Sequence, residues 1–299
     1  MDLWLMTTVW LTVLALVAFA ANSVFSRLAL AEQWIDAAGF TIVRLITGAL
    51  VLLLLLYFNR LSSKRALKAT SLMGSEAAPS KRGSWLAALM LFVYAVAFSY
   101  AYLQMETGSG ALVLFGMVQL TMVVATFIEG HRLRGLEVIG ILIAFAGLVY
   151  LVLPQVSTPS IMGVVLMALA GMAWAGYTLL GRGSNAPLAD TSFNFLRTVP
   201  MAVLLGVITL DQWFSTPQGL ILAALSGGLA SGVGYSIWYR VLRHLSATQA
   251  GVLQLLVPVI AAIGGVLFVA EPLSMRLIVS AALILGGIYL VIQTKAKTA

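Results

Sequence analysis

The side chains that could do chemistry in this sequence are mainly aromatic rings, with a few amide groups beside them. Tyr94 and Phe98 lie four residues apart and Tyr235 and Trp238 lie three apart, spacings that place each pair on one face of a helix. Aromatic faces joined by a few directional polar groups are the usual composition of a small-molecule site. We therefore expect the rings to shape a substrate pocket and the amides to orient the polar end of the substrate. The candidate substrate-binding residues are Asn22, Tyr94, Phe98, Gln119, Trp174, Tyr177, Tyr235, Trp238 and Gln254.

The sequence holds no constellation typical of an enzyme or of a metal centre. Cysteine is absent, which excludes disulfides and thiolate ligands, and the two histidines are His131 and His244. The ten carboxylates lie near the ends of apolar runs or between them. Catalysis needs a concentrated set of acids, bases or metal ligands. We expect no catalytic residue, no metal and no cofactor, and a membrane-embedded transferase acting on lipid is the remaining enzyme alternative.

The composition indicates that the elements that position these residues lie in a membrane. Of the 299 residues, 61% are hydrophobic and 9% are charged, whereas soluble domains carry about 25% charged residues. A helix needs about 20 apolar residues to span a bilayer, so the chain has room for ten such helices and little else. We predict an all-α polytopic membrane protein with transmembrane helices over 4–29, 35–58, 85–104, 107–129, 135–153, 160–181, 191–210, 217–240, 246–270 and 273–293.

The basic residues predict the orientation of these helices. Thirteen of the seventeen Lys and Arg residues follow the even-numbered helices, six of them in the long connection 59–84. Because cytoplasmic connections are enriched in Lys and Arg, we expect both termini to be cytoplasmic. The connection 59–84 is then a solvated cytoplasmic tether, with a lipid-binding basic patch as the alternative. The net charge of +7 therefore reflects membrane topology, and we expect no nucleic-acid partner.

Several short patterns occur twice in the same order. Phe40–Arg44 and Phe193–Arg197 share the pattern F-x-x-x-R, 153 residues apart, and each half later repeats a helix that ends in glutamate. These matches predict two copies of one five-helix unit, over residues 1–153 and 154–299. Since five is an odd number, the second copy must cross the membrane in the opposite sense. Inverted repeats of this kind are a common construction, with the substrate site near the midplane between the halves.

Ten helices in two halves, the repeated F-x-x-x-R and the spacing from Pro258 to Glu271 resemble the EamA-type branch of the drug/metabolite transporter superfamily. The resemblance covers almost the whole chain. Within the superfamily the pattern is most similar to the YddG-type exporters of aromatic amino acids and related metabolites. In the first half, Gly116 stands where the family usually has proline. The resemblance implies a basket of helices around a central cavity, lined by the first, third, fourth, sixth, eighth and ninth helices.

Charged residues and a proline within or at the ends of helices are candidates for structural or gating roles: Arg44, Arg197, Glu129, Glu271 and Pro258. Arg44 and Arg197 lie well inside their helices. They either snorkel towards an interface and cap a neighbouring helix end, which we favour, or bind a substrate carboxylate in a bidentate manner. Glu129 and Glu271 close their helices, and Pro258 interrupts helical hydrogen bonding and so supplies a hinge.

These features together predict a transporter of the bacterial inner membrane that exports small organic metabolites, and the resemblance implies aromatic or other hydrophobic amino acids. Since no carboxylate lies in the middle of a helix to relay protons, we expect a facilitator that works by alternating access. A proton-coupled multidrug efflux transporter is the alternative. The aromatic residues also suit interfacial belts, and small residues also suit close helix packing, so these structural roles stay open. We expect a monomer whose partners are a small-molecule substrate and the lipid bilayer.

Overall fold

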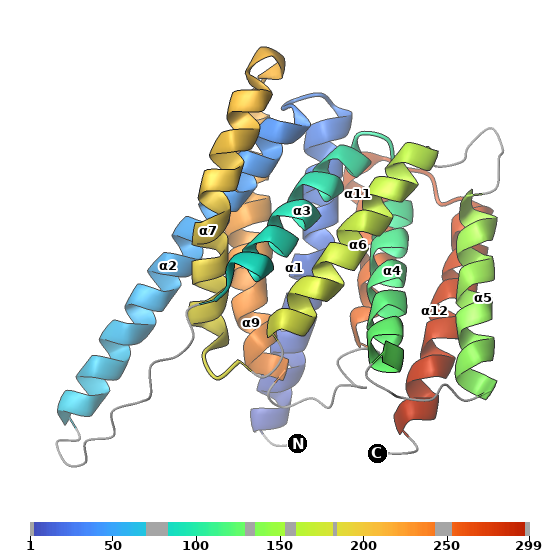
Figure 1. Ribbon diagram of the computed structural model, residues 1–299, viewed down its shortest axis with the longest axis horizontal. Helices are drawn as coiled ribbons and strands as arrows, with labels where there is room; N and C mark the ends of the chain where they lie inside the picture. Colours follow the sequence, from blue (N-terminus) through green and yellow to red (C-terminus); the bar gives the residue numbers. More distant parts are fainter. Residues whose placement is uncertain are drawn as a thin grey trace.

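The described part of the chain is a bundle of apolar helices. Figure 1 shows the computed structural model, in which the helices lie side by side and the start of α1 and the end of α12 lie at the same end of the bundle. The structure describes residues 3–69, 83–128, 135–152, 160–181, 184–242 and 253–296. Its helices are α1 (Leu3–Ala31), α2 (Ala37–Ala69), α3 (Trp85–Tyr102), α4 (Thr107–Ile128), α5 (Gly135–Val152), α6 (Ile161–Gly181), α7 (Pro187–Ile208), η1 (Leu210–Gln212), α8 (Pro217–Ala224), η2 (Leu225–Val233), α9 (Gly234–Leu242), α11 (Leu256–Val269) and α12 (Met275–Ala296).

The helices have the length and composition of membrane spans. Among the described residues, seven helical segments are long and apolar enough to cross a membrane, and Gly135–Leu151, Leu256–Val269 and Met275–Val291 are shorter apolar helices. Large hydrophobic side chains such as Trp10 and Leu142 are exposed on the surface of the bundle. Contiguous apolar surface of this kind is unfavourable in water and natural in lipid. The prediction of an all-helical, multi-pass membrane protein is confirmed.

Where the structure describes them, most helix boundaries agree with the predicted ones to within a few residues. The predicted helix 246–270 is interrupted at Leu255, and α11 begins at Leu256. Two further boundaries differ. The helix α2 continues to Ala69, so the predicted connection 59–84 begins as a helix. The residues after Phe58 are mostly polar and basic, and hydropathy alone does not distinguish an exposed polar helix from a connection. The helix α7 begins at Pro187 rather than at residue 191, because proline is favoured in the first turn of a helix.

The predicted helix 217–240 has a π-helical centre. The segment η2 joins α8 to α9, and it is rich in glycine and serine. A Cβ atom on Gly227 would lie 2.0 Å from the carbonyl oxygen of Arg44 in α2, so this close approach of the two backbones requires glycine. On the other side of η2, the Ser226 hydroxyl donates a hydrogen bond to the side-chain oxygen of Asn22 in α1. The π-helical segment therefore lies between α1 and α2, and π-helical turns occur frequently at functional sites.

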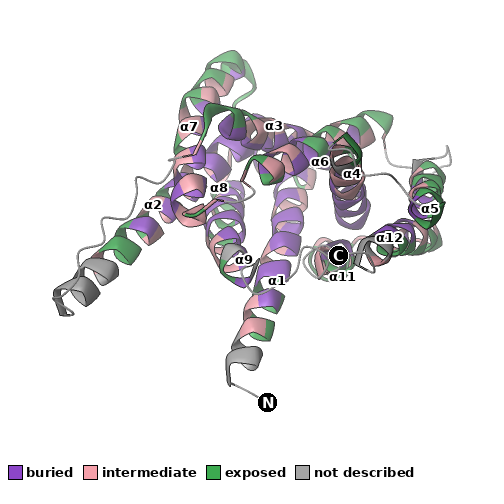
Figure 2. Ribbon diagram, turned by 60° about the horizontal axis from the view of Figure 1, so that its bottom comes forward, coloured by how far each residue is buried: buried purple, intermediate pink, exposed green. Residues whose placement is uncertain are grey.

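The helices pack around a shared interior. The helix α6 packs against α3 and α4, while α1 packs against α11 and against the segment from α8 to α9. The helices α2 and α7 pack together, and α5 and α12 pack chiefly against each other. Figure 2 shows buried residues on the inward faces of the central helices and places α5 and α12 at the edge of the bundle. The core consequently lies among α1, α3, α4, α6 and α9, which is where a binding site can be enclosed.

Candidate functional site

A cavity lined by aromatic side chains lies inside the bundle. Its lining comes from α1, α3, α4, α6 and α9 and consists of Phe19, Asn22, Ser23, Tyr94, Phe98, Leu114, Phe115, Trp174 and Tyr235. The structure thus brings together five of the predicted substrate-binding residues: Asn22, Tyr94, Phe98, Trp174 and Tyr235. Five of the six helices that the resemblance implied contribute to this lining; α11 supplies no lining residue from its described part.

The rings of the cavity wall form one continuous cluster. The ring centroid of Trp174 lies 5.0 Å from that of Tyr94 and 5.0 Å from that of Tyr235. Tyr94 lies 5.4 Å from Phe98, and Phe19 lies 5.7 Å from Tyr235. Centroid separations of about 4.5–7 Å in tilted or edge-on geometry are the favourable range for aromatic pairs. The wall therefore presents flat, apolar ring faces, which suit a ligand that is itself planar and apolar.

The hydroxyl group of Tyr94 is the polar centre of this wall. Asn22 Nδ2 donates a hydrogen bond to Tyr94 Oη at 3.2 Å, and Arg44 Nη2 donates to the same oxygen at 2.9 Å. The side-chain oxygen of Asn22 in turn accepts a hydrogen bond from Ser226. Because both ends of the Asn22 amide are held, its orientation is fixed before any ligand arrives. The cavity thus has a few directional polar groups among its rings, as small-molecule sites do.

The cavity is narrow in this conformation. The space between the rings is large enough for water and far smaller than an amino acid requires. Several of its side chains, including Tyr94, Phe98 and Tyr235, are almost fully buried. A ligand of that size can enter only when the helices that carry these rings move apart.

Two predicted residues support the cavity wall without lining it. Tyr177 is buried with its ring centroid 5.5 Å from that of Trp174. Trp238 is buried with its ring centroid 5.7 Å from that of Phe19, in edge-on geometry. Each ring therefore packs against a lining ring and holds it in place.

The structure does not bring the two predicted glutamines to the aromatic cavity. Phe115 lines that cavity, whereas Gln119, one turn further along α4, lines a second small cavity between α4, α5 and α12. Gln254 is half-buried just before the break at Leu255 that separates it from α11. A polar residue inside an apolar run carries no signal of which neighbouring helix it faces, so sequence reasoning had no means of separating these glutamines from Asn22.

Sequence reasoning missed four of the lining residues: Phe19, Ser23, Leu114 and Phe115. Phe19, Asn22 and Ser23 have helical spacings of three and four residues, so the face of Asn22 was a usable signal for two of them. Leu114 and Phe115 lie in a uniformly apolar stretch, where periodicity gives no preferred face.

The two arginines of the repeated F-x-x-x-R pattern have different environments. Arg44 is only 2% exposed, and its guanidinium carbon lies 4.7 Å from the ring centroid of Phe98 and 5.0 Å from that of Tyr94. The interpretation that Arg44 snorkels to an interface is therefore wrong, because the rings of α3 hold its side chain inside the bundle. Arg197 is half-buried, donates to the carbonyl oxygen of Phe193 at 3.3 Å and lies over the exposed ring of Trp85.

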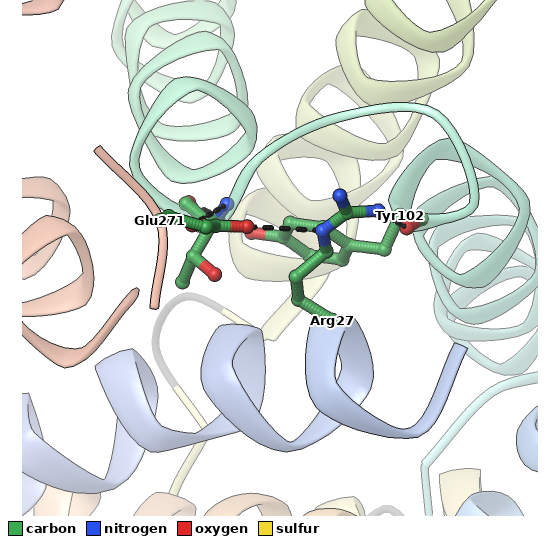
Figure 3. A network of polar contacts seen from close by, with 4 residues as sticks. Arg27, Tyr102 and Glu271 are labelled. Atoms are coloured by element: carbon green, nitrogen blue, oxygen red, sulfur yellow. Dashed lines mark hydrogen bonds and ion pairs between the residues drawn. The ribbon is translucent and has the colours of Figure 1, made fainter. Parts of the chain in front are cut away.

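The ion pair of Arg27 and Glu271, drawn in Figure 3, links residues at the ends of α1, α3, α4 and α11. Arg27 Nε lies 3.0 Å from Glu271 Oε1, and Arg27 Nη1 donates to the carbonyl oxygen of Tyr102 at 3.0 Å. The other carboxylate oxygen of Glu271 accepts a hydrogen bond from the backbone N–H of Thr107 at 2.8 Å. That N–H belongs to the first turn of α4, where a negative charge is favourable. Glu271 therefore links the end of α11 to α1 and to the start of α4.

The backbone around Glu271 is shaped for this contact. Ala270 has a left-handed conformation with φ of 57°, and the N–H of Glu271 donates back to the carbonyl oxygen of Gly265. A Cβ atom on Gly265 would lie 2.5 Å from Glu271 Oε2, so glycine makes room for the carboxylate.

Pro258 is buried in the first turn of α11, directly after the break at Leu255. Glu129, the predicted counterpart of Glu271, lies outside the described residues.

Glu106 lies in the connection between α3 and α4, and its pKa provides a test of the electrostatic interactions around Arg27 and Glu271. Burial raises the pKa of the Glu106 carboxyl above its ordinary value and the nearby Glu271 raises it further, while Arg27 lowers it. A raised pKa means that the folded protein holds this proton more tightly than the unfolded chain does. The free energy of unfolding should therefore fall as pH rises from the unfolded-state pKa through the folded-state pKa.

We expect the Glu106→Gln variant to lack this decrease in the free energy of unfolding with rising pH. The apparent melting temperature of the variant should therefore exceed that of the wild type at pH 7 and match it near pH 4. The measurement is thermal unfolding in detergent between pH 4 and pH 8. The exposed carboxylate of Glu32 provides the control variant Glu32→Gln. Identical pH profiles for the wild type and Glu106→Gln would contradict the prediction.

Apolar helices that surround an internal cavity are the construction of multi-pass membrane transporters. Residues 161–293 of the chain match the EamA-like transporter family. The resemblance to this family that the sequence motifs indicated is thereby confirmed. In the described residues, no group of three or more His, Asp or Glu side chains comes together in a way that could hold a metal ion.

The similarity to known relatives extends over nearly the whole chain. The chain is 46% identical over 288 residues to an uncharacterized protein of Pseudomonas aeruginosa, covering 96% of this chain and 95% of that one. It is 28% identical over 211 residues to an uncharacterized transporter of Archaeoglobus fulgidus, covering 68% of this chain and 74% of the other. It is 24% identical over 206 residues to a protein of Escherichia coli named "probable amino-acid metabolite efflux pump", covering 62% and 67%.

A solved crystal structure has the same fold. It covers 93% of this chain and 97% of its own chain, with a TM-score of 0.57 and 19% sequence identity. At that identity the likeness concerns the arrangement of the helices and not the ligand.

Proposed function

We propose that this protein exports small organic metabolites, in particular aromatic or other hydrophobic amino acids, across the bacterial inner membrane. The observation that carries the proposal is the wall of aromatic rings, in which Tyr94, Trp174 and Tyr235 face one internal cavity. Ring faces bind aromatic side chains by stacking, and Asn22 supplies a fixed polar group for the rest of the molecule. The name of the Escherichia coli relative, an amino-acid metabolite efflux pump, supports the same class of substrate.

We further propose ten transmembrane helices in two inverted halves, residues 1–153 and 154–299. The helix pairing supports this arrangement. In such a repeat, α1 corresponds to α6, α2 to α7, α3 to the segment that ends in α9, α4 to α11, and α5 to α12. The contact of α3 with α6 then corresponds to that of α9 with α1, and the contact of α4 with α6 corresponds to that of α11 with α1; all four contacts are present. The contacts of α2 with α7 and of α5 with α12 are also present, and each of them joins a helix to its own counterpart.

The distribution of Lys and Arg supports cytoplasmic termini, because thirteen of the seventeen follow the even-numbered helices. One chain encloses the cavity, which supports a monomer as the working unit. In this orientation the Arg27–Glu271 pair lies at the end of the bundle that faces away from the cytoplasm. We propose that the pair holds this end closed and opens when α1 and α11 separate during alternating access.

We propose that transport needs no ion gradient. The described carboxylates all lie near helix ends or between helices, including Glu137 in the first turn of α5 and Asp190 in the first turn of α7. A proton-coupled transporter usually holds an ionisable relay at membrane depth. The described part of the chain has no carboxylate there, which favours movement of the substrate down its own gradient.

The test is the flux of radiolabelled phenylalanine and tryptophan into liposomes that contain the purified protein, without an imposed ion gradient. We expect saturable uptake in which each amino acid competes with the other. Trp174→Ala should lower the rate at least tenfold, because it removes the ring between Tyr94 and Tyr235. The control is Trp10→Ala, since Trp10 is 63% exposed on the outer face of α1.

Each outcome of the flux experiment decides a part of the proposal. Equal rates for Trp174→Ala and Trp10→Ala would show that the aromatic cavity is not the binding site. Flux that begins only when a pH gradient is imposed would favour proton-coupled efflux over the facilitator. Absence of flux for every aromatic metabolite under all conditions would contradict the proposed substrate class.

A further inference from the structure

Arg44 is a buried cation without a counter-ion among the described residues. It lies two turns into α2, is 2% exposed and is among the largest fully buried side chains of the protein. Within the described part of the chain Arg44 forms no ion pair within 4.0 Å, whereas Arg27 pairs with Glu271. An ionised side chain inside the membrane region is unfavourable unless another group compensates its charge, and such residues commonly serve a function.

The contacts of the Arg44 guanidinium compensate its positive charge only in part. Arg44 Nη2 donates to Tyr94 Oη at 2.9 Å, and the group lies over the rings of Tyr94 and Phe98. Arg44 Nη1 is buried and has no hydrogen-bond partner in the described structure. Cation–π contacts contribute attraction, but a buried donor without an acceptor carries the full cost of its lost hydration. The guanidinium therefore keeps a buried N–H donor that has no acceptor among the described residues.

Tyr94 connects this donor to the cavity. Tyr94 lines the cavity, and its hydroxyl oxygen accepts hydrogen bonds from both Arg44 and Asn22. A phenolic hydroxyl that accepts twice still has its own hydrogen to donate. Tyr94 and Arg44, which are hydrogen-bonded to each other, consequently retain two donors, an O–H and an N–H, for a ligand acceptor. A carboxylate has the geometry and charge for this, because arginine pairs with carboxylates through charge-assisted, often bidentate hydrogen bonds.

We propose that Arg44 binds the carboxylate of the transported molecule, once the cavity widens and the substrate reaches past the rings of Tyr94 and Phe98. This inference rests on the proposed function and specifies it: the aromatic wall selects the side chain of the substrate, and Arg44 selects its acid group. The corresponding arginine of the other half, Arg197, has a different environment, because it is half-buried and lies over the exposed ring of Trp85. The proposed carboxylate site is therefore the one on the side of α2.

The test is the binding of three matched probes to the purified protein: phenylalanine, phenylalaninamide and phenethylamine. The three share the aromatic ring, and only the first has a carboxylate. We expect the wild type to bind phenylalanine at least tenfold more tightly than either of the others. This comparison needs no variant, so equal affinities for the acid and the amide would overturn the proposal by themselves.

Two variants locate the selectivity. Arg44→Gln should bind the acid and the amide equally well, and its affinity for the amide shows whether its cavity is intact. Arg44→Lys keeps the charge but loses the planar pair of donors, so it should retain a reduced preference for the acid. Arg197→Gln is the matched control and should keep the wild-type preference. Full preference for the acid in Arg44→Gln would overturn the proposal.

Binding and flux together separate this inference from the proposed function. Flux of aromatic amines and amides with no preference for acids would contradict the carboxylate site and leave the proposed export function standing. Selective binding of the acid, lost in Arg44→Gln, in a protein that transports none of the probes would contradict the export function and support the site.

Discussion

The substitution Gly287→Ala is expected to lower the apparent melting temperature of the purified protein by about 2–12 °C. A Cβ atom on Gly287 in α12 would lie 2.4 Å from the carbonyl oxygen of Gly140 and 2.6 Å from the amide nitrogen of Ala144, both in α5. The contact is reciprocal, because a Cβ atom on Gly140 would lie 2.5 Å from the carbonyl oxygen of Gly287. Since these neighbours are backbone atoms, the two helices must separate to admit one methyl group.

Separation is costly because α5 and α12 pack chiefly against each other. Overpacking a tight contact typically costs about 1–3 kcal/mol, and each kcal/mol shifts the melting temperature of a large domain by about 2–4 °C. The control is the preceding glycine. A Cβ atom on Gly286 would meet nothing within 4 Å, and alanine there improves helix propensity by roughly 1 kcal/mol. Melting curves of the two variants in the same detergent check the prediction, and equal melting temperatures would show that α5 and α12 do not approach so closely.

Neutralising Glu271 is the second change with a large expected effect. In Glu271→Gln the amide oxygen can still accept from the N–H of Thr107, but Arg27 loses its counter-ion. The two side chains are only 19% and 10% exposed, so the unpaired Arg27 stays largely away from water. Removing one member of a fully buried pair costs about 3–5 kcal/mol; with this partial exposure we expect about 1–3 kcal/mol.

A double-mutant cycle separates the pair from its surroundings. The loss in Arg27→Gln/Glu271→Gln should be smaller than the sum of the two single losses, with a coupling of about 1–3 kcal/mol. The measurement is the free energy of unfolding of all four proteins by denaturant in detergent. Asp211→Asn is the control, because Asp211 is exposed. A coupling near zero would mean that Arg27 and Glu271 do not depend on each other.

The helical architecture could be predicted from the sequence because mean hydropathy is a property of a whole segment and does not depend on contacts between segments. Apolar runs of about 20 residues have few alternatives to a membrane span, and most helix boundaries were correct to a few residues. The positions of Tyr94 and Phe98 were also predictable, because two aromatic residues four positions apart share a face. Trp174 and Tyr235 followed from the same reasoning on other helices.

The failures concern properties that depend on contacts between helices. The burial of Arg44 depends on the rings of Phe98 and Tyr94, which lie about fifty residues later in the chain; no local pattern records that contact. Gln119 and Asn22 are both polar residues in apolar helices, and only the packing of α4 against α12 distinguishes their surroundings. The extension of α2 to Ala69 is polar, so it gives no hydropathy signal.

The π-helical segment sets the rotational phase of the helix that follows it. In an α-helix each residue turns the chain by about 100°, whereas the wider π-helical turns accommodate more residues. After Leu225–Val233, the side chains of α9 therefore point in directions that differ from those of an uninterrupted continuation of α8. With α-helical winding throughout, the same residues would turn Tyr235 away from Trp174 and present another side chain to the cavity. The identity of the cavity wall is thus determined by how the backbone is wound as well as by which residues it carries.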